Sequence, residues 1–250
     1  MSNFHYYFIP NTVGVIFSIF FILYFGLKYK NASYNDKLKP VKYISFLLIT
    51  LEIVKIFWRI SYNGNFQPGT YPLIFCSFVM YFYPIICCTK ENSLSSRVCK
   101  AISIVPCVIM GVLYVVINPY IHNPTMTSFI NNFHSRFYHF CMFAVAVYML
   151  VTKMYDFRFT DHFPVTVTVG MYLLFSCVIS IFLKTDISLF TINSPYFGFI
   201  YKRFGYCVGN ILLMILLYLI SLSVYWFINR IIKAHFKIQH DSISTERTSL

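Results

Sequence analysis

Residues 43–60 read YISFLLITLEIVKIFWRI, an apolar run that carries Glu52, Lys55 and Arg59 in its second half. Its length is close to the roughly 20 residues that a helix needs to cross a bilayer. At spacings of three and four, the charged side chains share one helical face, where Glu52 and Lys55 can neutralise each other away from lipid. Charged groups inside a membrane face other protein groups or a polar cavity. The run therefore predicts a membrane helix whose charged stripe faces the interior of a helix bundle.

The composition of the chain also indicates a membrane protein. Of its 250 residues, 58% are hydrophobic, 20% are aromatic and only 11% are charged, and the mean hydropathy is +0.66. A soluble domain could not bury that much apolar surface. The net charge of +12 is compatible in principle with nucleic-acid binding. However, the basic residues lie between apolar runs rather than along one face, so we expect them to set membrane topology and expect no nucleic-acid partner.

Further apolar runs of similar length give about seven candidate membrane spans. We expect these spans at Val13–Leu27, Tyr43–Ile60, Pro72–Thr89, Ala101–Ile117, His134–Thr152, Pro164–Leu183 and Tyr206–Asn229. The first span follows a start without Lys or Arg, so we expect a retained helix rather than a removed signal peptide. The predicted fold class is all-α, a polytopic membrane helix bundle.

The basic residues orient this bundle. Lys and Arg are concentrated in the first, third and fifth loops and after the last span, whereas the N-terminal arm and the loop 61–71 have none. Because such residues accumulate on the cytoplasmic side, the N-terminus is expected outside and the C-terminus in the cytoplasm. We expect one transmembrane domain over residues 1–233 and a polar, disordered cytoplasmic tail over residues 234–250. The membrane itself stays open between a bacterial plasma membrane and a eukaryotic internal one.

This topology brings several polar side chains to one depth. Cys76, His139, Lys55 and Asn210 each lie about four or five residues, or roughly 6–8 Å of helical rise, from the outer end of a predicted span. A thiol, an imidazole, a cation and an amide thus share a layer beneath the outer surface. This layer is the candidate functional site.

Each of these residues also has a purely structural explanation. Cys76 is one of eight cysteines, and cysteine packs in helices as a small hydrophobic residue. Glu52 and Lys55 can form a pair that only fixes the helix register. Arg59 lies beside Trp58 and can belong to an aromatic and basic belt at the membrane surface. A histidine inside a span is harder to explain this way, because its ring needs a polar partner.

Other kinds of chemistry find no support in the sequence. There is no Cys-x-x-Cys pair for zinc, although Cys87, Cys88 and Cys99 leave acylation or metal binding open, and we expect no metal. P-loop, dinucleotide and Gly-x-Ser-x-Gly motifs are absent, so we expect no cofactor. The last span has neither a lysine that could bind retinal nor an Asn-Pro-x-x-Tyr motif. The number of predicted spans in the chain does not by itself indicate a receptor.

One part of the chain resembles a known family. The stretch 51–58, LEIVKIFW, is followed by a short loop with Gly64 and then by YPLIFCS at residues 71–77. This order is similar to that of the YwaF-type integral membrane proteins, which include the transmembrane protein 164 group and carry a charged span, a Leu-Pro-Leu-x-x-Cys-Ser element and a later histidine. Tyr71 stands at the first position of that element. His139, in FYHF, matches the later histidine, with His134 as an alternative, and Asn210 falls in a loosely similar last segment. The resemblance covers about residues 13–229, and its specific part is the block Glu52–Ser77.

The resemblance implies a cysteine-dependent acyltransferase that acts on membrane phospholipids. Cys76 would take the acyl group as a thioester, and His139 would deprotonate the thiol or the acceptor hydroxyl. Lys55 would lower the pKa of the thiol or bind a lipid phosphate, with Glu52 holding it in place. Two alternatives remain: a transporter of ions or small solutes that uses Glu52 and Lys55, and a scaffold whose polar layer only fixes helix packing.

Overall fold

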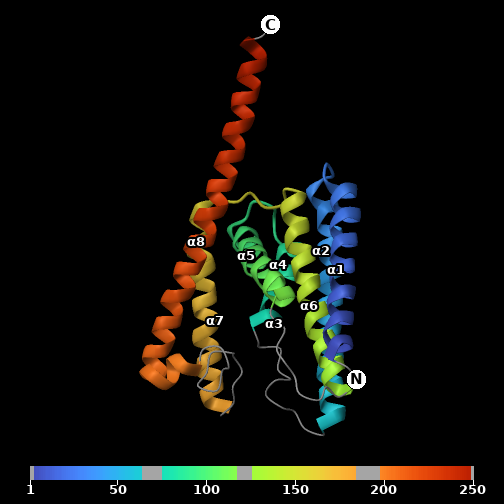
Figure 1. Ribbon diagram of the computed structural model, residues 1–250, viewed down its shortest axis with the longest axis vertical. Coiled ribbons are helices and arrows are strands. Elements are labelled where there is room, and N and C mark those ends of the chain that lie inside the picture. Colours follow the sequence, from blue (N-terminus) through green and yellow to red (C-terminus); the bar gives the residue numbers. More distant parts are fainter. Residues whose placement is uncertain (1–2, 64–74, 117–125, 184–197, 249–250) are drawn as a thin grey trace. The chain divides into compact units, whose positions relative to one another are not determined.

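The computed structural model describes residues 3–63, 75–116, 126–183 and 198–248, and Figure 1 shows these ranges as helices joined by short turns. Within them the regular structure is helical and contains no strand, which confirms the all-α class. The side chains of Cys76, of Asn210 and of residues 231–248 lie outside the description.

The helices follow the predicted apolar runs. They are α1 (Asn3–Tyr29), α2 (Tyr34–Asn63), α3 (Phe75–Met80), α4 (Phe82–Cys88), α5 (Leu94–Val116), α6 (Met126–Val151), the short 3-10 turn η2 (Phe159–Asp161), α7 (His162–Leu183) and α8 (Gly198–Thr248). The described part of each predicted span lies in one helix, except that the third span is divided between α3 and α4 and that Thr89 and Thr152, the last residues of two spans, follow the ends of α4 and α6. One stretch of the described helices, Phe8–Tyr29, is long and apolar enough to cross a membrane, with 22 residues and a mean hydropathy of 2.0. Two apolar helical stretches, Ser77–Cys88 and Ile211–Phe227, are shorter.

The third span is divided at Tyr81, whose amide donates to the carbonyl of Phe78 at 3.2 Å. Pro84 explains this position. Proline has no N–H to donate to the carbonyl of Met80, four residues earlier, and its ring crowds that carbonyl. The helix therefore ends at Met80 and begins again at Phe82.

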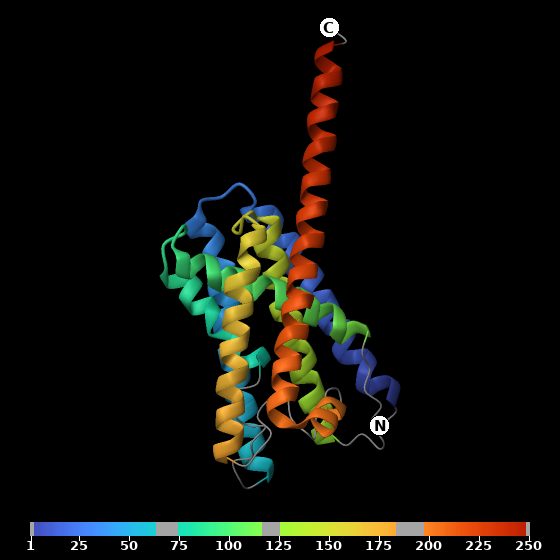
Figure 2. The ribbon, with the colours of Figure 1, turned by 90° about the vertical axis from the view of Figure 1, so that its left-hand side faces the viewer.

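The chain divides into two compact units. The first comprises Met1–Asp156 with Ser176–Ser188, and the second comprises Phe157–Phe175 with Leu189–Leu250. The sequence had indicated a single domain over residues 1–233. In the first unit α6 is the central helix, and it contacts α1, α2 and α5. Figures 1 and 2 both show α6 alongside α1 and α2.

The contact between α1 and α6 is unusually close. A Cβ atom built on Gly14 would lie 2.1 Å from Cδ2 of Phe140, so only glycine fits at this position. One turn later, the Ser18 hydroxyl lies 3.1 Å from the carbonyl oxygen of Phe140 and 2.9 Å from that of Gly14. Small residues four apart let two helices approach until their backbones interact, which is a common packing mode in membranes.

Helix α8 contains a sharp turn at Gly205, whose φ of 76° and ψ of 170° are a backbone conformation that favours glycine. The helix continues to Thr248 and so includes residues 234–248, for which the sequence predicted a disordered tail. Several residues of this segment, such as Ala234, Lys237 and Gln239, have high helix propensity, which is compatible with continuation of α8.

Candidate functional site

The candidate site is built around an ion pair on α2. Glu52 and Lys55 are both buried, with exposed fractions of 3% and 8%. The Nζ of Lys55 contacts Oε2 of Glu52, as the spacing of three residues predicts. The Ser77 hydroxyl donates to Oε1 of Glu52 at 2.9 Å. Both carboxylate oxygens therefore have a partner, and the hydroxyl joins α3 to the charged face of α2.

Helix α6 reaches the same place through His134. Its Nε2 lies 3.0 Å from the carbonyl oxygen of Leu51, the residue before Glu52. Because a carbonyl only accepts, Nε2 carries the hydrogen, and Nδ1 is the acceptor nitrogen of the neutral ring. Tyr138 stacks on this ring, with 5.8 Å between the ring centroids. His134 thus attaches α6 to the backbone of α2 beside the ion pair.

His139 lies on a different face of α6. It follows His134 by five positions, or about 140° around the helix axis. The ring is buried, with 3% exposed, and its Nδ1 donates to the carbonyl of Ser135 at 2.5 Å. The acceptor nitrogen of the neutral ring is therefore Nε2. Lys55 is close enough to both histidines for its charge to act on them, but only His134 has a described hydrogen bond beside the ion pair.

Arg59 extends the charged stripe by one turn of α2. It is partly buried and lies within electrostatic reach of Glu52, as does Tyr81 at the start of α4. Arg59 thus adds a second cation near Glu52 on the predicted stripe.

Two predicted site residues have side chains outside the described part of the structure. Cys76 belongs to α3 by its backbone and directly precedes Ser77, so its Cα lies about 3.8 Å from that of the residue bound to Glu52. Asn210 belongs to α8 in the second unit. The structure thus brings together Glu52, Lys55 and His134, brings Cys76 to the same place through the chain, and leaves Asn210 unassigned to the site.

Sequence reasoning missed Ser77 as a partner of Glu52, although it is the residue after the candidate thiol. It also treated two buried cations as topology signals. Arg136 is 1% exposed, and its guanidinium donates to Asn132 Oδ1 at 2.9 Å and to Asn11 Oδ1 at 2.5 Å. The four-residue spacing of Asn132 and Arg136 was the available signal, because residues at this spacing meet on a helix.

The second such cation is Lys100, which is 2% exposed. Its Nζ lies 3.3 Å from the carbonyl oxygen of Glu91 and 4.5 Å from the centroid of the Tyr34 ring. An ammonium over an aromatic face makes a stabilising cation–π contact. Lys100, near the start of α5, therefore holds this helix against Tyr34 at the start of α2.

Among the described side chains, no group of three or more His, Cys, Asp or Glu residues is arranged to hold a metal ion. The arrangement instead supplies fixed charges and neutral imidazoles in a buried setting. A buried ammonium can stabilise a thiolate or a phosphate oxygen, and a neutral imidazole can accept a proton. Comparisons of the chain with known protein families, with curated proteins and with solved structures found no match.

Proposed function

We propose that the chain is a multi-pass membrane protein of the YwaF type that transfers acyl groups on membrane phospholipids through a thioester at Cys76. One observation carries this proposal: Ser77, the neighbour of Cys76, donates to the carboxylate of Glu52, which pairs with the buried Lys55. Lys55 is the buried cation of this group, and a cation beside a thiol favours the thiolate, which is the nucleophilic form.

The proposed membrane arrangement has seven spans, with the N-terminus outside and the C-terminus in the cytoplasm. The helical state of the described parts of all predicted spans supports it, as does the apolar stretch Phe8–Tyr29. In this arrangement the ion pair lies in the outer half of the membrane, near the depth of lipid ester carbonyls. The substrate could then reach the site from the outer leaflet.

The proposed reaction has two steps. His139 accepts the proton of the Cys76 thiol, and the thiolate attacks an ester carbonyl of a phospholipid. The ester C–O bond breaks, a C–S bond forms, and the lysophospholipid oxygen takes the proton from the imidazolium. In the second step an acceptor hydroxyl loses its proton to His139 and attacks the thioester, which transfers the acyl group and restores the thiol. His134, with Nε2 bound to Leu51, would hold α6 in place.

We expect Cys76→Ser to reduce acyl transfer by about a thousandfold or more, because removing the nucleophile of a covalent mechanism removes most of its rate. The purified protein is incubated with phospholipid and examined by peptide mass spectrometry for an acyl adduct that hydroxylamine removes. The adduct is expected on Cys76 in the wild type and absent in Cys76→Ser. His139→Ala should slow its formation, while His134→Ala should mainly lower stability.

Cys88→Ser is the matched control, since Cys88 is exposed and distant in sequence from the ion pair. It should keep the adduct and the activity. Undiminished transfer in Cys76→Ser would refute the thioester mechanism.

A non-catalytic scaffold is the second candidate, and the saturation of Glu52 by Lys55 and Ser77 favours it. A scaffold needs these contacts for packing alone, so Cys76→Ser would then change nothing and substitutions of Lys55 would change only stability. A transporter that uses Glu52 would instead show an ion-dependent flux that Glu52→Gln abolishes.

The proposed topology can be tested with two cysteines at its cytoplasmic side. Cys88 is exposed and Cys99 is buried, and burial raises the pKa of the Cys99 thiol from 9.0 to about 11. The thiolate fraction of Cys99 at neutral pH is therefore about a hundredfold lower than that of an ordinary thiol. A membrane-impermeant maleimide should label Cys88, but not Cys99, in inside-out vesicles, and should label neither residue in right-side-out vesicles. Labelling of Cys88 from the outside would reverse the topology.

The raised pKa of Cys99 also gives a pH dependence. Because the folded state holds this proton more tightly than the unfolded state, the thiol favours folding below pH 9, and this contribution is lost as the pH rises from 9 through about 11. Labelling of Cys99 should increase over the same interval.

A further inference from the structure

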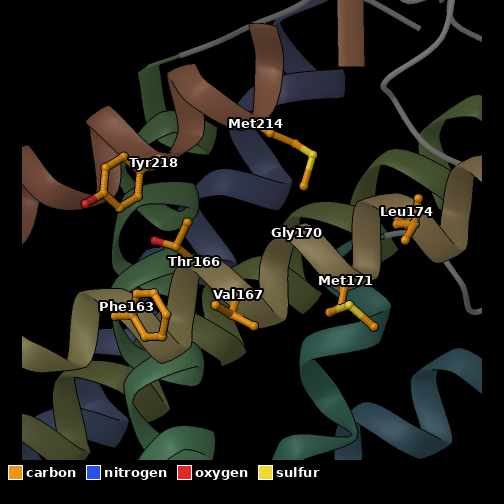
Figure 3. A pocket seen from close by; sticks show the side chains of 8 residues that line it. All are labelled: Phe163, Thr166, Val167, Gly170, Met171, Leu174, Met214 and Tyr218. Carbon is orange, nitrogen blue, oxygen red and sulfur yellow. The ribbon is translucent and has the colours of Figure 1, made fainter. Parts of the chain in front are cut away.

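The second unit contains an apolar groove between α7 and α8, shown in Figure 3. One wall is the face of α7 from Phe163 to Leu174, and the other is formed by Met214 and Tyr218 of α8. Its volume is about 360 Å³, at the lower end of the range of about 300–1,000 Å³ that is usual for ligand sites. Thr166, the hydroxyl-bearing side chain on the α7 wall, donates to the carbonyl of His162 at 2.8 Å. The α7 wall therefore suits hydrocarbon.

Gly170 lies in the middle of the α7 wall. A Cβ atom at this position would lie 3.0 Å from Cε of Met214, which is tighter than an ordinary contact. In Figure 3 the methionine side chain extends from α8 toward this glycine. The absence of a side chain at Gly170 thus admits the end of the Met214 side chain, and most of the residues that line the groove are exposed, Met171 with 62% and Leu174 with 57%.

The length of the groove fits one lipid chain. From Phe163 to Leu174 the helix rises by about 16 Å. The hydrocarbon core of a bilayer is about 30 Å thick, so that the chains of one leaflet occupy about 15 Å. The groove therefore matches the depth of a single leaflet.

The end of the groove near His162 has the character of a membrane surface. The His162 ring lies 6.1 Å from that of Tyr218 and 6.4 Å from that of Tyr225, between centroids. Trp226 directly follows Tyr225. The guanidinium of Arg230, four residues later, lies 4.7 Å from the centroid of the Trp226 ring, and both side chains are exposed. Tyrosine, tryptophan and arginine gather at the level of lipid headgroups, and arginine attracts anionic ones. In the proposed topology this end faces the cytoplasm.

We propose that the groove binds one acyl chain of an anionic phospholipid of the cytoplasmic leaflet, with its headgroup at Arg230. This lipid site rests on the membrane arrangement proposed above but does not depend on catalysis at Cys76. It lies in the second unit, whereas the ion pair lies in the first.

The site can be tested with a photoreactive lipid. The full chain is reconstituted into phosphatidylcholine vesicles that contain a small fraction of phosphatidylglycerol with a diazirine in its acyl chain. Vesicle flotation after a carbonate wash first checks membrane integration, so that failure of the membrane arrangement is seen separately. After illumination, peptide mass spectrometry should find the lipid concentrated on Met171 and Met214 rather than spread over exposed apolar residues such as Ile16 and Phe20 of α1.

Two matched substitutions on α7 make the test specific. Val167 lines the groove and Val178 does not, yet their exposed fractions are similar, 47% and 43%. Val167→Trp should fill the groove and lower labelling there by about tenfold, whereas Val178→Trp should leave it unchanged. Arg230→Gln should remove the preference for phosphatidylglycerol over a phosphatidylcholine probe with the same diazirine.

Three outcomes would overturn the lipid site. Equal labelling of all exposed helices would mean that the probe reacts from the surrounding bilayer and that the groove binds no particular lipid. Equal loss in both tryptophan variants would show a general effect on α7. Labelling of exposed residues such as Ile16 and Phe20 without labelling of Met171 or Met214 would show that the groove is closed to lipid.

Discussion

Replacement of Lys55 by methionine is expected to lower the free energy of unfolding by about 3–5 kcal/mol, because it removes the ion-pair partner of the buried Glu52 carboxylate. Glu52 is 3% exposed, and its remaining described contact, the hydroxyl of Ser77, cannot neutralise it. The double variant Glu52→Gln/Lys55→Met should recover most of the loss, since it removes both charges together. Unfolding is measured by the circular dichroism of the helices during titration of the detergent-solubilised protein with a denaturing detergent.

The chain offers a matched control for this experiment. Lys39 and Asp36 also form an ion pair at a spacing of three residues, with 2.7 Å between Nζ and Oδ1, but both side chains are well exposed, at 56% and 43%. Lys39→Met should therefore cause no measurable change in stability. If both lysine variants are equally stable, or if the double variant is no more stable than Lys55→Met, Lys55 does not compensate a buried charge on Glu52.

The second large effect is expected at Gly14. In Gly14→Ala the new methyl group would meet the Phe140 ring at 2.1 Å, so that the ring or the whole of α1 must move. Overpacking of this kind costs about 1–3 kcal/mol, and it should exceed the gain of up to about 1 kcal/mol in helix propensity. The variant should therefore unfold at a lower denaturant concentration than the wild type.

Gly26→Ala on the same helix is the control. A Cβ at Gly26 would lie 3.4 Å from Cγ1 of Val151, which is an ordinary contact, so this substitution should be neutral or stabilising. The same exchange on the same helix thus has opposite expected signs. A stabilised Gly14→Ala would show that α1 and α6 are not in close contact.

The all-α fold was predictable because apolar periodicity and length act locally. The ion pair of Glu52 and Lys55 was also predictable, since three residues on one helix suffice to bring the groups together. The hydrogen bond from Ser77 of α3 to Glu52 was not predictable, because it depends on how a separate helix is placed against α2. The same holds for Arg136, whose bond to Asn11 joins residues 125 positions apart.

The division of the third span is an intermediate case. Pro84 is visible in the sequence, and its effect on the carbonyl four residues earlier follows from its chemistry. Whether a proline bends a helix or divides it depends on the neighbouring helices, which can satisfy the freed backbone groups. The sequence therefore indicated where the helix would be disturbed but not that it would become α3 and α4.

The two contacts of Ser18 bear on the order of events during biosynthesis. Its long-range acceptor, the carbonyl of Phe140, lies 122 residues further along the chain. A ribosome that adds about 5–20 residues per second completes that residue roughly 6–24 s after Ser18. During this interval the hydroxyl can donate to the carbonyl of Gly14 within its own helix, where the two atoms lie 2.9 Å apart. Before α6 is synthesised, the Ser18 hydroxyl of α1 therefore already has an acceptor in an apolar environment. When α6 packs against α1, the same hydroxyl can also contact the carbonyl of Phe140 while the backbone of α1 stays helical.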